Sequence, residues 1–150
     1  MHSLQILKLS KNNISFLPSF DNLTNLKMLD LSHNNLSSEV VRDHFSRLIK
    51  LEEVSLKDNN LEELPNFFHC ERLTKIEAGW NGIGSVRDED VVGLDSLQML
   101  DLSHNRLEDI PESIMMLPKL RELNLASNRL KKLADGIIAV WPSLLKIDLS

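Results

Sequence analysis

Apolar residues return along this chain in a fixed frame, with polar residues between them. In the clearest copy, Leu97, Leu100, Leu102 and Leu107 are apolar, and one asparagine, Asn105, sits inside the apolar run. Along the whole sequence, the frame opens at Leu4, Leu26, Leu51, Leu73, Leu97, Leu120 and Leu144. The first six copies are complete, the seventh is cut off by the end of the chain, and successive copies begin 22 to 25 residues apart.

Each copy divides into a short predicted strand and a longer return segment. In Leu100-Asp101-Leu102, alternation at period two sends both leucines inward and Asp101 outward, which predicts a strand. Strands of successive copies are expected to stack in parallel, about 4.8 Å apart. Because the return segment (for example residues 112–119) is wider than a strand, we expect the stack to curve, with its strand side concave.

This frame resembles the signature of the leucine-rich repeat family, and the resemblance covers essentially every residue. It implies an α/β fold, a leucine-rich-repeat solenoid built as a curved right-handed βα superhelix. The sheet would be parallel and concave, and the convex side helical or irregular. The resemblance also implies that residues 1–150 form a single leucine-rich-repeat domain, long enough to exceed the roughly three units that such stacking needs.

One asparagine recurs at the same place in every complete copy. These residues are Asn12, Asn34, Asn59, Asn81, Asn105 and Asn128. They fall where the chain leaves the strand and turns over the core, so backbone groups there would be buried without partners. A side-chain amide both donates and accepts, and we expect it to bridge the turns of its own and the next copy.

The second copy has the longest return segment. Its apolar residues Val41, Phe45 and Leu48 fall at helical spacing, which predicts a helix over residues 39–49 with Ser38 as the N-cap. Such a helix could dock a partner on the convex side. The alternative is a slightly longer return loop.

Two other return segments carry predicted core residues of unusual type. Cys70 takes a place that leucine fills in several other copies, so we expect a buried small hydrophobic residue rather than a reactive or metal-binding thiol. In the sixth copy, Ile137, Ile138 and Trp141 are expected to pack inside.

Charge and cysteine content limit the classes of partner and the cellular locations that we expect for this chain. Seventeen basic against 22 acidic residues give a net charge of -5, and without a basic stripe this argues against a nucleic-acid partner. The single cysteine excludes an internal disulfide, and the cysteine-rich caps shared by secreted members of the family are absent. No apolar segment resembles a signal peptide or approaches the roughly 20 residues that span a membrane. We therefore predict a cytoplasmic protein without membrane insertion.

The alternative is an extracellular protein. Three N-glycosylation sequons open at Asn13, Asn22 and Asn35. The repeat itself supplies asparagine before an apolar residue, so about one or two sequons would arise by chance.

The concave strand face is the usual working surface of this family. On it, Glu77 and Asp101 are adjacent like charges beside Trp80, Met99 and His104. Because aromatic residues and methionine are enriched at interface cores, this group predicts a protein partner that carries a basic group beside an apolar side chain. The full set of candidate partner-binding residues is Met28, Asp30, Asp58, Glu77, Trp80, Met99, Asp101 and His104.

Other charges on this face are expected to neutralise each other. Glu53 should pair with Lys75, and Glu122 with Lys146, since each pair lies on neighbouring strands. Exposed pairs of this kind contribute about 0–1 kcal/mol and need no partner.

The sequence gives little support for catalysis. Residues 79–84 contain three glycines but lack the Lys-Ser/Thr of a phosphate-binding loop. His33 and His104 stand three strands apart, roughly 14 Å, which is too far for one metal ion. Ser, His and Asp meet in residues 30–33 and 101–104, but on a flat face without an oxyanion pocket. We predict no enzymatic activity, no metal and no cofactor.

The favoured function is a protein-interaction scaffold. The copies that contain Leu-Pro resemble those of intracellular repeat proteins that regulate small GTPases, kinases or phosphatases, an assignment made by analogy. The alternatives are part of an extracellular receptor or adhesion ectodomain, and the repeat region of a larger kinase-type enzyme. If nothing follows Ser150, the last strand also leaves a free parallel edge through which copies could self-associate.

Overall fold

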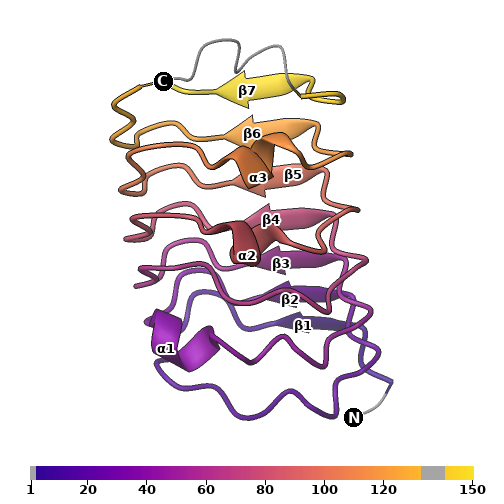
Figure 1. Cartoon of the computed structure of the whole chain (residues 1–150). Coiled ribbons are helices and arrows are strands. Elements are labelled where there is room, and N and C mark those ends of the chain that lie inside the picture. Colours follow the sequence, from indigo (N-terminus) through magenta and orange to yellow (C-terminus); the bar gives the residue numbers. More distant parts are fainter. Residues whose placement is uncertain (1–2, 133–140) are drawn as a thin grey trace.

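Seven short strands form one parallel sheet in the computed structural model, which describes residues 3–132 and 141–150. The strands are β1 (Ile6–Lys8), β2 (Met28–Asp30), β3 (Glu53–Ser55), β4 (Lys75–Glu77), β5 (Met99–Asp101), β6 (Glu122–Asn124) and β7 (Lys146–Asp148). Their order in the sheet follows their order in the chain, so each copy stacks directly on the one before it (Figure 1). The predicted parallel solenoid is confirmed.

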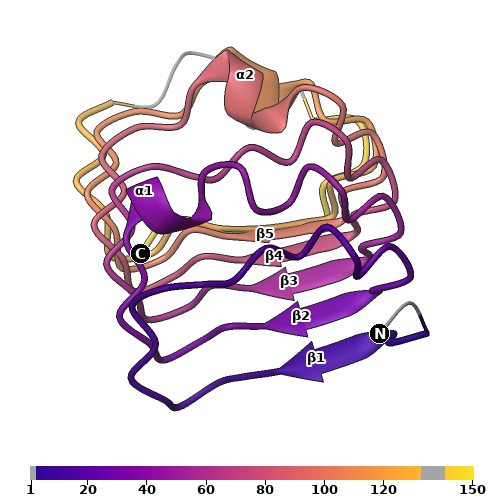
Figure 2. The ribbon, with the colours of Figure 1, turned by 90° about the horizontal axis from the view of Figure 1, so that it is seen from below.

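The return segments run along the opposite side of the solenoid. Within the described residues, three of them contain a single helical turn, α1 (Ser38–Val41), α2 (Asp88–Val91) and α3 (Glu112–Met115). Seen along the stack, the sheet forms one wall and the return segments with α1 and α2 form the other (Figure 2). The convex side is therefore mixed, partly helical and partly irregular, as the resemblance implied.

The space between the two walls is filled by the apolar residues of the repeat frame. Leu26, Leu29 and Leu31 of the second copy are fully buried, and the same frame positions are buried in the third to sixth copies. In the seventh copy they are only partly buried. Cys70 is also fully buried, as predicted. Trp141 is only 7% exposed, and its indole N–H donates to the carbonyl of Ile114 at 3.2 Å. The predicted core residues Ile137 and Ile138 lie outside the described residues.

The strand register confirms which residues lie side by side on the sheet. Ile6, Met28, Glu53, Lys75, Met99, Glu122 and Lys146 form one row across the strands. Lys8, Asp30, Ser55, Glu77, Asp101, Asn124 and Asp148 form the other. Side chains of both rows point away from the core because they alternate with the buried central residue of each strand.

The recurring asparagines form a hydrogen-bonded ladder between copies. The carboxamide oxygen of Asn105 accepts from the backbone N–H of Ile83 at 3.0 Å. Its amide nitrogen donates to the carbonyls of Ala78 and Leu102, both at 3.0 Å. The same three kinds of bond recur at Asn34, Asn59, Asn81 and Asn128.

The direction of the ladder differs from the prediction. Each asparagine bridges its own copy and the preceding one, not the next one, because the turn carries its side chain back over the previous turn. Asn12 has no preceding copy in the chain. It is exposed and bonds only to the carbonyls of Leu9 and Ser10.

The residue before each ladder asparagine has a left-handed backbone, which the sequence did not reveal. These residues are Lys11, His33, Asp58, Trp80, His104 and Ser127, with φ between 52° and 58°. A non-glycine residue in this region costs roughly 1–2 kcal/mol, and for bulky residues it is a genuine outlier. The hydrogen bonds of the ladder offset that cost, because the turn places the side-chain amide of the following asparagine within reach of the preceding copy.

The helix predicted over residues 39–49 is wrong in its extent. Helix α1 covers only Ser38–Val41, and residues 42–47 form turns. Val41, Phe45 and Leu48 are still buried at helix-like spacing, because successive turns bring them inward without continuous helical bonding. The predicted N-cap is also wrong. Ser37 is the N-cap residue, while the Ser38 hydroxyl accepts from the N–H groups of Glu62 and Glu63 in the next copy.

We predict that interior ladder asparagines matter more for stability than the first one. Asn59→Ala and Asn105→Ala each leave buried backbone groups unpaired, and should lower the free energy of unfolding by about 1–3 kcal/mol. Asn12→Ala is the control and should cost clearly less, since Asn12 is exposed and joins no two copies. Urea denaturation followed by circular dichroism measures all three. Equal stability of Asn12→Ala and Asn105→Ala would contradict a ladder that joins copies.

Candidate protein-binding surface

The outward side chains of the first and third residue of each strand form a surface that we call the sheet face. It carries the acidic residues Asp30, Glu53, Glu77, Asp101, Glu122 and Asp148 and the basic residues Lys8, Lys75 and Lys146. Acidic groups outnumber basic ones along the whole strip, so the sheet face attracts positively charged groups. Met28 and Met99 are half-buried within it, and Ile6 is 55% exposed.

Ion pairs on the sheet face follow the prediction only in part. Lys146 pairs with Glu122 of the neighbouring strand at 4.0 Å, as expected. Lys75 instead reaches Glu77 at 3.0 Å, two residues along its own strand, where both side chains stand on the same side of the sheet. The predicted pair of Lys75 with Glu53 is therefore not formed. Glu77 is partly neutralised as a result, and Asp101 beside it in the register is not.

Two candidate aspartates also hold the ends of their strands. Asp30 accepts from the hydroxyl of Ser32 at 2.6 Å and from its N–H at 3.0 Å. Asp101 accepts from the N–H of Ser103 at 2.9 Å. Burial raises the pKa of Asp30, but the hydrogen bonds from Ser32 and Ser10 and the charge of Lys8 together lower it by more, so the pKa lies below its ordinary value. These carboxylates are structural as well as exposed to a partner.

The N-terminal half of the sheet face is hollowed. The hollow has a volume of about 280 Å³ and is lined by side chains of β1 to β4, among them Met28, Asp30 and Glu77. Ser55 lines the hollow, and its small side chain lies between the larger Asp30 and Glu77 of the neighbouring strands. Lys57 also lines this hollow.

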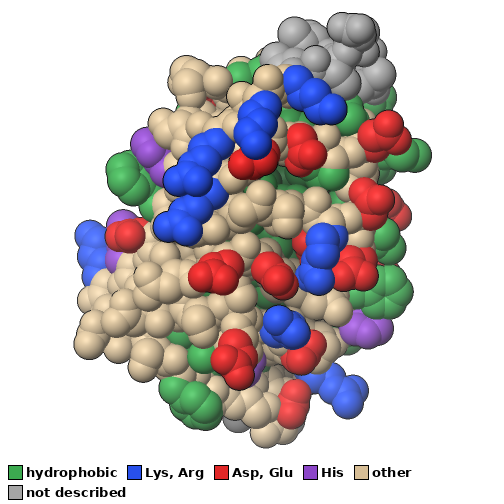
Figure 3. All heavy atoms as spheres, turned by 60° about the vertical axis from the view of Figure 1, so that its left-hand side comes forward, with side chains coloured by type: hydrophobic (Ala, Val, Ile, Leu, Met, Phe, Trp, Pro, Cys, Tyr) green, Lys and Arg blue, Asp and Glu red, His purple; other side chains and the backbone are tan. Residues whose placement is uncertain are grey.

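The left-handed residues line the edge at which the strands end. Nδ1 of His33 lies 2.7 Å from Oδ2 of Asp58 in the next copy. The Trp80 indole stacks on the His104 imidazole, with ring centroids 3.8 Å apart and an angle of 20° between the rings. Figure 3 turns this edge toward the reader and shows histidine side chains beside hydrophobic and acidic ones along it. Four of the left-handed residues therefore form two separate pairs, and Asp58 contacts His33 rather than Trp80.

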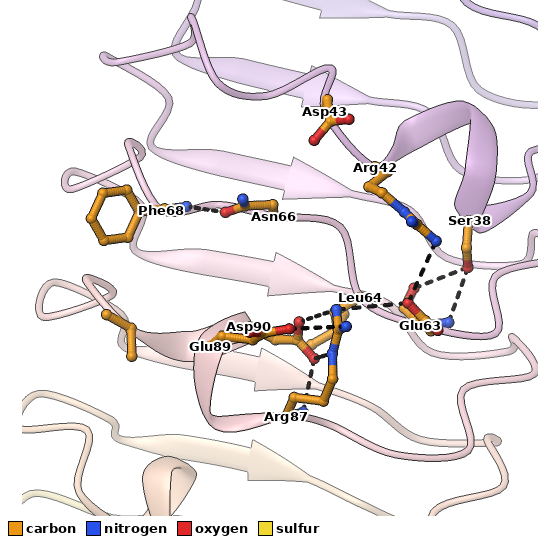
Figure 4. Close-up of a pocket in the computed structure, with 11 residues that line it drawn as sticks. Ser38, Arg42, Asp43, Glu63, Leu64, Asn66, Phe68, Arg87, Glu89 and Asp90 are labelled. Carbon is orange, nitrogen blue, oxygen red and sulfur yellow. Dashed lines mark hydrogen bonds and ion pairs between the residues drawn. The ribbon is translucent and has the colours of Figure 1, made fainter.

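The convex side has a hollow of about 410 Å³ between α1 and α2, where the third copy has no helix (Figure 4). All of its charged groups except Asp43 bind one another. Arg87 contacts Asp90 at 2.8 Å, Glu89 at 2.9 Å and Glu63 at 3.6 Å, and Arg42 contacts Glu63 at 3.9 Å. The main-chain N–H of Arg87 also donates to Asp90. Of these contacts, Arg87–Glu63 joins α2 to the preceding copy, and the contacts of Arg87 with Glu89 and Asp90 hold the start of α2.

The candidate residues thus fall into two groups and one further residue, Asp58, which contacts His33. Around β4 and β5 the structure brings together Glu77, Trp80, Met99, Asp101 and His104. Met28 and Asp30 lie in the hollow over β1 to β4, which Glu77 also lines. Sequence reasoning missed Ser32, Ser55 and Lys57 as lining residues of that hollow. Only the small size of Ser55 between larger neighbours in its row could have indicated it.

No helix within residues 3–132 and 141–150 is long and apolar enough to cross a membrane. The same described residues contain no group of three or more His, Cys, Asp or Glu side chains placed to hold a metal ion.

We predict that Asp30 stabilises the fold in a pH-dependent way. Because its folded pKa lies below the unfolded value of 3.8, the ionised carboxyl stabilises the protein above that pH, and this is lost as the pH falls through the folded pKa. Asp30→Ala should lower the free energy of unfolding by about 1 kcal/mol at neutral pH. The gap to wild type should narrow in acid. Asp109→Ala, which removes an exposed carboxylate, is the control and should show no such gap.

Comparison with known proteins gives a consistent result. A family model described as "Leucine rich repeat" matches residues 71–130, and one described as "Leucine Rich repeats (2 copies)" matches residues 2–45. Lumican of Oryctolagus cuniculus is 38% identical over 107 residues, which are 71% of this chain and 55% of that protein. Osteomodulin of Bos taurus is 41% identical over 93 residues, 61% of this chain and 22% of that protein.

The chain spans about half or less of the relatives that it matches, since only 31% of Homo sapiens lumican is covered. Solved structures agree on the fold. The leucine-rich repeat domain of APL1 superposes with a TM-score of 0.80 at 25% identity, over 88% of this chain and 35% of that one. InlP of Listeria monocytogenes gives a TM-score of 0.80 at 24% identity, over 97% of this chain and 39% of that one.

Proposed function

Because this chain belongs to the leucine-rich repeat superfamily, we propose that it binds a protein partner through its sheet face, outside the cell. Repeat proteins of this superfamily generally mediate protein–protein interaction. The observation that carries the choice of surface is the group on β4 and β5, where Trp80 is 51% exposed and Met99 lies in register beside Glu122 and Lys75.

The location rests on the relatives. Lumican and osteomodulin are extracellular matrix proteins, which favours the extracellular alternative over the cytoplasmic protein expected from the sequence. The three sequon asparagines Asn13, Asn22 and Asn35 are exposed, so an attached glycan would meet no steric obstacle at its first atom.

A free cysteine is often a liability in an oxidising compartment, and the structure supplies a reason why this one is tolerated. Cys70 is fully buried, and desolvation raises the pKa of its thiol to about 12. The reactive thiolate is therefore scarce at physiological pH, and the sulfur is shielded from other thiols.

The partner is proposed to carry a lysine or arginine beside an apolar side chain. The basic group would meet Asp101, whose charge has no basic partner among the described residues, while the apolar group would pack on Met99 and Trp80. Buried aromatic contacts with neighbouring charge complementarity are typical of the centre of a protein interface.

A binding role is favoured over catalysis by what the Ser, His and Asp side chains do. Asp101 accepts from the backbone of Ser103, and His104 stacks on Trp80. Asp30 holds Ser32, while His33 contacts Asp58 of another copy. Neither Asp-Leu-Ser-His segment aligns its own histidine between its serine and its aspartate, as a charge relay requires.

Partner binding is tested by affinity capture from a matrix and cell-surface protein preparation, followed by affinity measurement with the identified partner. Met99→Ala and Asp101→Asn should each weaken binding at least about tenfold, or 1.4 kcal/mol. Asparagine keeps the acceptor for the N–H of Ser103 and removes only the charge. Met116→Ala is the matched control, because Met116 is 78% exposed on the convex side. If Met116→Ala weakens binding and the other two variants do not, the proposed surface is wrong.

The location is tested on the protein isolated from its natural source. We expect treatment with an amidase that removes N-linked glycans to increase its electrophoretic mobility, and peptide mapping to place the glycan on Asn13, Asn22 or Asn35. A protein recovered from the cytosol with all three asparagines unmodified would contradict an extracellular location.

A further inference from the structure

A notch opens beside Trp80 because one residue at its border, Gly82, has no side chain. The residue after each ladder asparagine occupies the same place in successive copies. These residues are Asn13, Asn35, Asn60, Gly82, Arg106 and Arg129. Gly82 is the only one without a side chain, and it lies between Asn60 on one side and Arg106 on the other. The notch has a volume of about 360 Å³, within the usual range for small-ligand sites.

The lining of the notch contains one group of each kind needed to hold a small polar ring. Trp80 and His104 supply stacked aromatic surface, Arg106 a cation, Glu62 an anion and Asn60 an amide. Stacking on His104 holds the Trp80 indole in place before a ligand binds, which reduces the entropy lost in ordering the side chain on binding. A Cβ atom placed on Gly82 would lie 3.9 Å from Cζ of Arg106, so this guanidinium borders the space directly.

The two charges of the notch are available to a ligand. Within residues 3–132 and 141–150, neither the Arg106 guanidinium nor the Glu62 carboxylate forms an ion pair or a side-chain hydrogen bond. Glu108, which is the equivalent of Glu62 in the fifth copy, is paired, since Lys131 of the next copy contacts it at 2.6 Å. Arg129, the equivalent of Arg106 in the sixth copy, forms no ion pair within the described residues.

The opposite signs select the chemistry of the ligand. A ligand whose only charge is a carboxylate or sulfate would meet Arg106 but be repelled by Glu62, and one whose only charge is an ammonium group would meet Glu62 but be repelled by Arg106. A hydroxyl group both donates and accepts, so neighbouring hydroxyls can serve Glu62, Arg106 and Asn60 together. The C–H face of the same ring would pack on the exposed indole surface.

We propose that this notch binds a single neutral sugar ring, a pyranose with adjacent free hydroxyl groups. The site lies at the edge where the strands end. It shares Trp80 with the partner surface proposed above but uses neither Met99 nor Asp101, so variants of those two residues distinguish the two sites. Trp80 forms its apolar wall, and Glu62 and Arg106 are its hydrogen-bonding residues.

The test is titration of the whole chain with methyl glycosides of glucose, galactose, mannose and N-acetylglucosamine, each followed by tryptophan fluorescence and saturation-transfer NMR. Fluorescence reports mainly on the notch, because Trp80 is 51% exposed while the other tryptophan, Trp141, is 7% exposed. We expect at least one neutral glycoside to bind. Glucuronic acid adds a carboxylate to the same kind of ring, and glucosamine adds an ammonium group. Each should bind at least about tenfold more weakly than the neutral glycosides.

Gly82→Asn provides the decisive variant. It introduces the residue that three other copies carry in this column, and Gly82 does not have a positive φ. The new Cβ atom would lie 3.3 Å from the Leu61 carbonyl oxygen, so the fold should be retained with a shift of a few tenths of an ångström there. The new side chain fills the notch and should reduce glycoside binding at least about tenfold. Gly84→Ala is the matched control, since a Cβ atom there meets nothing within 4 Å, and it should bind like wild type.

Three results would overturn the proposal. They are the absence of binding by every neutral glycoside, stronger binding of glucuronic acid or glucosamine than of the neutral sugars, and wild-type binding by a folded Gly82→Asn. None of these results bears on the partner surface, whose variants lie on β5.

Discussion

The asparagine ladder is the interaction on which the rest of this structure depends. A leucine-filled solenoid must turn its backbone over the core once in every copy, and each turn buries N–H and C=O groups that water cannot reach. From Asn34 onward, one side chain in each copy satisfies a donor of the preceding copy and carbonyls of both copies. The ladder therefore joins neighbouring units with directional bonds, whereas leucine packing alone would leave their register less well determined.

The ladder also shapes the edge of the molecule. To place each asparagine, the residue before it adopts a left-handed backbone, which brings successive side chains of this column close together. The fold imposes this backbone geometry on any residue at these positions, and the sequence decides which side chains lie on the edge. In this chain the result is a His33–Asp58 contact in one half and a stacked Trp80–His104 pair in the other.

The surfaces of the solenoid differ in how far their polar groups are already satisfied. On the convex side, Arg87 contacts three acidic residues, and the hollow there is held together by its own ion pairs. On the sheet face, Glu77 and Glu122 have lysine partners, whereas Asp101 uses its carboxylate only to hold its strand end. Several of the groups left available, among them Asp101 and Arg106, lie on β5 and the adjoining edge beside the exposed Trp80, and both proposals concern that part of the chain.

How much the sequence determined follows from how local each feature is. Period-two leucines and a recurring asparagine fixed the parallel sheet, its register and both outward rows, because these depend only on alternation and on repetition in the chain. Side-chain partners could not be predicted, since Lys75 can reach either Glu53 or Glu77, and only the fold decides between them. Helix α1 is shorter than its apolar spacing indicated, because turns can bury the same residues. The left-handed turns, the backward direction of the ladder and the notch at Gly82 all arise between copies, so only the tertiary structure could show them.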